Sequence, residues 1–237
     1  MPLSAYRHLD EARILATLSR LRDRIAERFP DSGLSRVATE LLGLSAEVSD
    51  FARYVRRPTW SIRVGVAGAI LAMVLVLILG IGPLQPQAGI SGMGELVQAI
   101  EASISTLVFL GAAIYFLVSL EDRLKRRRAL RTLHQLRSVA HVVDMHQLTK
   151  DPAHVTMASS DTRSSPERSL TPADLGRYLD YCSELLSVIS KLAALHVQHF
   201  NDAVTLAAVN DIESLTVGLS NKMWQKITLL DQARLGR

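Results

Sequence analysis

VGVAGAILAMVLVLILGIG, residues 64–82, and ASISTLVFLGAAIYFLVSL, residues 102–120, decide the fold, because neither stretch contains a charged residue. At about 1.5 Å of rise per helical residue, each covers roughly the 30 Å of a bilayer's hydrocarbon core. Buried helices of soluble proteins rarely remain uncharged over such a length. We therefore predict an all-α integral membrane protein with a hairpin of two transmembrane helices, at about 62–82 and 102–120 within segment 58–120.

The charges that flank these stretches predict the topology. The segment before the first stretch is rich in arginine, and the predicted loop at 83–101 contains no Lys or Arg. Basic residues mark the cytoplasmic side of a membrane protein. We therefore expect a two-span protein of the cell (inner) membrane, bacterial in type, with both termini in the cytoplasm and a short external loop. The basic residues that follow the second stretch are Arg123, Lys125, Arg126, Arg127, Arg128 and Arg131.

The remainder of the chain has the pattern of a cytoplasmic helical bundle with coiled-coil-like contacts. Apolar residues recur every three or four positions, which places them on one face of each helix. The segment 30–33, with Pro30 and Gly33, separates two helices in an N-terminal hairpin, 1–57. The N-terminal stripes are Ile14, Leu18, Leu21 and Ile25, followed by Leu34, Val37, Leu41, Leu44, Val48, Phe51 and Val55.

The second half of the chain predicts three further segments. A helix over 121–150 extends the second span, and 151–170, rich in Ser, Thr and charge, is a flexible linker. Thr171, Pro172 and Asp174 are typical of a helix start, and they open a C-terminal hairpin, 171–237, with a break near Asn201 and Asp202. The expected buried stripes are Leu133, Leu136, Ala140 and Val143, then Leu175, Tyr178, Cys182, Leu185, Ile189, Leu192 and His196, then Ile212, Leu215, Leu219, Met223, Ile227 and Leu230.

The basic cluster Arg123–Arg131 has two readings. Such a density of cations suits the phosphate backbone of a nucleic acid. Here it begins within a helical turn of the predicted bilayer exit, where anionic headgroups attract each basic side chain by roughly 1 kcal/mol. We therefore expect its six cations to bind anionic lipid headgroups, and we expect no nucleic-acid partner.

The histidines and the cysteine do not form a metal or catalytic motif. His134 and His141 share a helix face but lie two turns apart, roughly 10 Å, too far to bind one ion. His141 and Asp144 are neighbours three residues apart and form a candidate polar contact. The single cysteine excludes an intramolecular disulfide. Without a nucleophile elbow, a phosphate-binding glycine loop or HExxH, the sequence predicts no enzyme, no metal and no cofactor.

Small and polar residues repeat within the second apolar stretch. Ser105, Ala112 and Ser119 recur at heptad spacing, with Tyr115 between them. Small residues allow transmembrane helices to approach closely, so these positions suit a packing seam between the two spans. The alternative is the wall of a pore, which would need several subunits because two helices per chain enclose no channel.

Two functions fit these features. The first is a non-enzymatic scaffold or anchor whose cytoplasmic bundle forms a homo-oligomer or recruits a cytoplasmic protein to the membrane. The second is an oligomeric, pore-forming effector that permeabilises the membrane on a cytoplasmic signal. In layout, a soluble helix, two closely spaced spans and a long helix, the chain is similar to the SLATT-type two-helix effectors of bacterial conflict systems. The long helical tail from Thr171 departs from their compact form.

Overall fold

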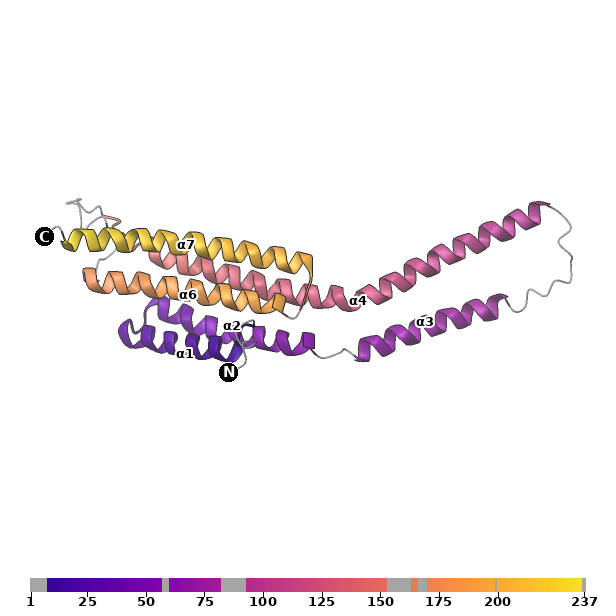
Figure 1. The fold of residues 1–237 in the computed structure, drawn as a ribbon, viewed down its shortest axis with the longest axis horizontal. Coiled ribbons are helices and arrows are strands. Elements are labelled where there is room, and N and C mark those ends of the chain that lie inside the picture. The colour runs from indigo at the N-terminus through magenta and orange to yellow at the C-terminus, as the bar shows by residue number, and fades with distance from the viewer. Residues whose placement is uncertain are drawn as a thin grey trace. The chain divides into compact units, whose positions relative to one another are not determined.

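All regular secondary structure in the described part of the chain is helical, which confirms the helical fold class (Figure 1). The computed structural model describes residues 8–56, 60–81, 93–152, 163–165, 170–198 and 200–235. The helices are α1 (Glu11–Arg28), α2 (Gly33–Arg56), α3 (Trp60–Ile81), α4 (Met93–Leu148), α6 (Pro172–Gln198) and α7 (Ala203–Leu235).

The chain divides into two compact units. Residues 1–56 and 126–237 form one, called here the helical unit, and residues 57–125 form the other, called the apolar unit. The helix α4 contributes its first part to the apolar unit and its second part to the helical unit. It begins at Met93, inside the segment predicted as a loop, and continues to Leu148.

Local signals define the N-terminal hairpin of the helical unit. The Asp10 carboxylate accepts a hydrogen bond from the Arg13 amide at 3.2 Å, which caps the first turn of α1. After α1, Asp31 adopts a left-handed backbone conformation with φ of 58°, and α2 begins two residues later. The predicted break is therefore confirmed. The predicted stripe of α1 is buried, as is that of α2 except for Val55, which is only partly buried.

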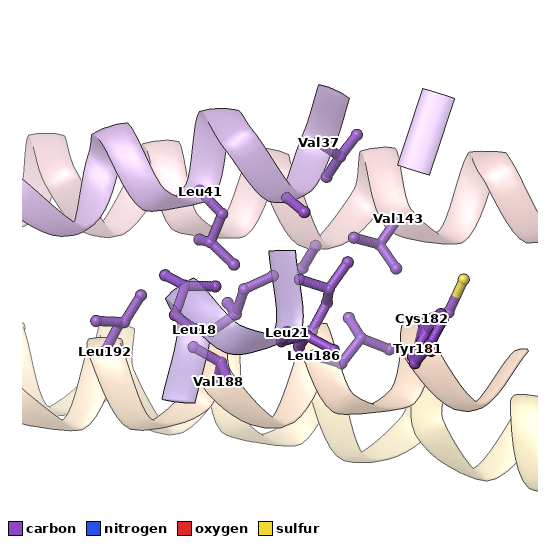
Figure 2. Packing of buried hydrophobic residues seen from close by; sticks show 14 of the residues in the cluster. Leu18, Leu21, Val37, Leu41, Val143, Tyr181, Cys182, Leu186, Val188 and Leu192 are labelled. Carbon is purple, nitrogen blue, oxygen red and sulfur yellow. The ribbon is translucent and has the colours of Figure 1, made fainter. Parts of the chain in front are cut away.

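The helix α6 has the most extensive buried surface and contacts α1, α2 and α7. Its start is as predicted, because the Asp174 amide donates to Thr171 Oγ1 at 3.1 Å and the Thr171 hydroxyl donates to Asp174 Oδ2 at 2.6 Å. All seven residues of its predicted stripe are buried. Figure 2 shows side chains of α1, α2, α4 and α6 meeting in this core; those labelled include Leu18, Leu41, Val143, Cys182 and Leu192.

Two further helices complete the core. In α4 the four residues of the predicted stripe, from Leu133 to Val143, are buried. In α7 the stripe is buried at four of its six positions, and Leu215 and Ile227 are partly buried at its margin. The helix begins just after Asp202, where a break was predicted. The segment predicted as a linker lies largely outside the described residues.

The apolar unit has the opposite character, because many of its described large apolar side chains are exposed and none is buried. One helix in the described part of the chain, α4, is long and apolar enough to cross a membrane, and the most apolar stretch after Ile104 is not buried at all. The α3 segment Val64–Leu75 is a shorter apolar helix over the residues described. The exposed apolar side chains of this unit include Leu71, Leu75, Ile104, Leu107, Val108, Phe109, Phe116 and Val118.

Candidate functional site

Two members of the basic cluster belong to the apolar unit and have neighbours on α4 itself. The Arg123 guanidinium lies over the Phe116 ring, 5.0 Å from its centroid, and remains exposed. Lys125 is only 8% exposed, and its ammonium forms an ion pair with the Glu121 carboxylate at 2.6 Å. Of these two cations, Arg123 is therefore the one accessible to a headgroup.

Arg126 connects α4 to the start of α7. Its Nε and Nη2 donate to Asp202 Oδ1 at 2.9 and 2.6 Å. The other carboxylate oxygen, Oδ2, accepts hydrogen bonds from the Thr205 amide at 2.9 Å and the Thr205 hydroxyl at 2.8 Å. Asp202 thus caps α7 and pairs with a cation at once. Burial alone would raise the pKa of Asp202, but the hydrogen bonds from Arg126 and Thr205 outweigh burial and hold that pKa below its usual value.

The remaining cations lie on the outer surface of the helical unit. The Arg128 guanidinium lies 4.9 Å from the centroid of the Tyr54 ring on α2. Arg127 and Arg131 are exposed and line a groove between α2 and α4. The six cations therefore have different neighbours, and headgroup binding by the cluster stays a prediction.

This groove, called here the α2–α4 groove, is an open depression of about 760 Å³. Its floor contains Leu44, Leu130 and Val139. The α2 side carries the exposed acids Glu40 and Glu47, and the α4 side carries the exposed bases Arg127, Arg131 and His134. Within the described part of the chain, none of these five charged or titratable side chains forms an ion pair.

The proposed seam residues of α4 lie in the apolar unit. Ser105 and Ala112 are exposed, and Tyr115 is 71% exposed. Ser119 is partly exposed, and its hydroxyl donates to the Phe116 carbonyl at 3.0 Å, which satisfies it within its own helix. A packing seam and a pore wall both stay predictions for these four positions.

The polar contact that the structure shows for Asp144 is with Gln147, and the pairing of Asp144 with His141 stays a prediction. His141 is exposed. Asp144 instead accepts a hydrogen bond from Gln147 Nε2 at 2.7 Å, and Gln147 Oε1 accepts one from Lys226 Nζ of α7 at 2.6 Å. The Lys226 ammonium also donates to the Gln147 carbonyl at 3.1 Å, at the C-terminal end of α4 where carbonyls lack helical partners. Burial is the main cause that lowers the pKa of Lys226.

Sequence reasoning missed the Lys226 and Arg126 contacts, because their partners lie far away along the chain. Lys226 is 79 residues from Gln147, and Arg126 is 76 residues from Asp202. The only local signal was the placement of Asp202 at a predicted break, which is typical of a helix cap. Which cation would reach that carboxylate depends on how the helices pack.

His196 is the most deeply buried titratable group of the bundle stripes besides Cys182. Its ring stacks on Phe51 with centroids 5.0 Å apart, and Nδ1 lies 3.2 Å from the Leu192 carbonyl. If Nδ1 carries the proton and donates to that carbonyl, Nε2 is left as a buried acceptor, and it has no partner among the described residues. Burial lowers the pKa of His196 to about 4, so the ring is neutral at pH 7.

Among the described residues, no group of three His, Cys, Asp or Glu side chains is placed to hold a metal ion. The site features are therefore a set of interhelical polar contacts and one open groove, rather than a cluster of reactive groups. No protein-family model, curated protein or solved structure matches the chain.

Proposed function

We propose that the chain is a membrane-anchored scaffold whose helical unit binds protein at the membrane surface. The observation that carries this proposal is the contrast between its two units. The helical unit buries its apolar stripes in a common core. The apolar unit leaves side chains such as Phe109, 76% exposed, without cover from the chain. An apolar surface of this kind marks a membrane or a protein interface.

The bilayer is the cover that fits the length and composition of these segments. The apolar part of α4 is long enough to span the hydrocarbon core, and it carries no charge between Ala102 and Leu120. The arginine-rich flanks and the loop without Lys or Arg support two spans with cytoplasmic termini. On this topology the helical unit lies in the cytoplasm, where it is available to a partner.

The anchor is tested by fractionation of the expressed full chain. The wild-type protein should remain in the membrane pellet after an alkaline carbonate wash. Phe109→Arg places a charge near the centre of the second span, where insertion costs about 2.5–3.5 kcal/mol, and should shift a substantial fraction to the supernatant. Trp224→Arg is the matched control, because Trp224 is also an exposed aromatic but lies on α7. A wild-type chain that the carbonate wash releases would refute the anchor.

The scaffold and the pore-forming effector differ in what they do to the membrane. A scaffold leaves liposomes that contain the purified protein impermeable to an encapsulated dye. An effector releases the dye, and a bulky residue at Ala112, such as Ala112→Phe, should then suppress the release. Dye release by the wild type that this substitution abolishes would favour the effector over the scaffold.

A further inference from the structure

The α2–α4 groove has three properties of a protein interface. Its floor is apolar, its two sides carry opposite charge, and within the described part of the chain the charged groups on those sides have no ion-pair partners. A nucleic acid or a lipid headgroup would suit the α4 side, but Glu40 and Glu47 on the opposite side would repel either anion. The groove therefore suits a protein surface that carries both signs of charge around an apolar centre.

Gly43 adds an independent observation. It lies inside α2, where glycine destabilises a helix by about 1 kcal/mol relative to alanine. A Cβ placed on Gly43 would meet no atom of the chain within 4 Å, so the packing of the chain itself does not require glycine there. Gly43 is exposed and lines the groove. Without a side chain, this position permits close approach of another backbone.

The arrangement of charges is self-complementary under one kind of symmetry. The helices α2 and α4 run antiparallel along the groove, since Gly33 lies against His146 at one end and Tyr54 against Arg128 at the other. A two-fold axis along the groove brings the acidic α2 side of one copy opposite the basic α4 side of its partner, at the same level. A two-fold axis across the groove would place acid against acid.

The antiparallel register decides which charges would meet. Counting along both helices from their end contacts, Glu47 lies level with residues 132–135 of α4, which include His134 and lie within one helical turn of Arg131. Within the helical unit, the same axis leaves the two copies of α4 running in one direction. Each ion pair occurs twice, because the contact is isologous.

We propose that the α2–α4 groove is the homodimer interface of this protein, with Glu47 of each copy opposite Arg131 of the other and Gly43 at the close approach. This deepens the proposed scaffold function by naming its partner as a second copy of the chain. All residues that line this surface belong to the helical unit.

Charge reversal tests the pairing in the full chain purified in mild detergent. Glu47→Arg and Arg131→Glu each place like charges opposite one another twice. Each should raise the dimer dissociation constant at least roughly tenfold, measured by mass photometry. The double variant E47R/R131E reverses both signs and should restore the dimer. Glu213→Arg, on α7, is the matched control and should leave the dissociation constant unchanged.

Gly43→Leu provides a second test that folding defects cannot imitate. A Cβ at this exposed position meets no other atom of the chain, and leucine has a better helix propensity than glycine, so the thermal stability of the monomer should be retained or raised. The same side chain would hold the two copies apart, and the dimer should be lost. Circular dichroism measures the first effect and mass photometry the second.

Three results would overturn the proposal: a monomeric wild type, a dimer that resists both single reversals and Gly43→Leu, or a double reversal that stays monomeric. A dimer that resists these changes would place the interface elsewhere, for example on the exposed α7 side chains Leu206, Val217 and Trp224. Carbonate extraction of the same variants reports membrane anchoring separately. Loss of the dimer with the anchor intact thus refutes this interface and not the anchor.

Discussion

Replacement of Asp202 should show how much the stability of the protein depends on the carboxylate that caps the start of α7. In Asp202→Ala the amide and hydroxyl of Thr205 lose their common acceptor, and Arg126 loses its two hydrogen bonds to Asp202. Loss of an N-cap costs about 1 kcal/mol. The Arg126 side chain is 39% exposed, so water screens its ion pair with Asp202. We therefore expect loss of the ion pair to cost only about 1 kcal/mol more. The expected destabilisation is about 2 kcal/mol.

Asp202→Asn separates the two contributions. Asparagine is as good an N-cap as aspartate, so the cap of α7 should survive while the charge opposite Arg126 is lost. We expect about half of the effect of Asp202→Ala. Asp211→Ala is the control, because Asp211 is an exposed acid on the same helix, and surface changes of this kind stay within about 0.5 kcal/mol. Denaturant unfolding of the detergent-solubilised chain, followed by circular dichroism, measures all three.

The same carboxylate predicts a pH dependence with a definite sign. The pKa of Asp202 is lower in the folded protein than in the unfolded chain, so the unfolded state binds the proton more readily. The advantage of the wild type over Asp202→Asn should be complete above the unfolded pKa of about 4 and should decline as the pH falls through the folded pKa. If Asp202→Ala is no less stable than Asp211→Ala, the carboxylate does not hold α4 and α7 together as inferred here.

Three further predictions concern other parts of the chain. The pKa of His196 is about 4 in the folded protein, against an ordinary value of 6.5. As the pH is lowered from 6.5 to 4, the unfolded state takes up a proton that the folded state does not, so the free energy of unfolding should fall by up to about 3 kcal/mol. His196→Phe should flatten that slope, and an unchanged slope in this variant would contradict the assignment. Gly33→Ala should destabilise by about 1 kcal/mol, because its Cβ would lie 2.1 Å from the His146 ring and the ring must move. Gly218→Ala, with open space, should be neutral or stabilising in the same thermal melts. For topology, an impermeant maleimide should label Ser91→Cys in intact cells and Ser214→Cys only after permeabilisation. The native Cys182 adds little background, because it is buried and burial raises its pKa to about 12. Labelling of Ser214→Cys in intact cells would reverse the predicted orientation.

Apolar spacing was enough to predict most of the helices and the faces that they bury. The spacing of the apolar residues predicted the cores of α1, α2, α6 and α7, because burial of one face of a helix imposes a period that survives without tertiary information. The helix start at Thr171 and Pro172 could also be predicted, because a helix cap is a local contact between residues three positions apart. The long uncharged stretches likewise predicted an apolar helix whose side chains are not buried against the rest of the chain.

The partners of the polar groups could not be predicted in this way, because they depend on how the helices pack. The pair His141 and Asp144 was inferred from spacing on one helix, yet Asp144 contacts Gln147, which in turn binds Lys226 from another helix. The pairing of Arg126 with Asp202 has the same origin, because the two residues lie on different helices. The period of a helix fixes the direction in which a side chain points. The neighbour that it reaches depends on the rotation and axial register of the helices against one another, which no local pattern specifies.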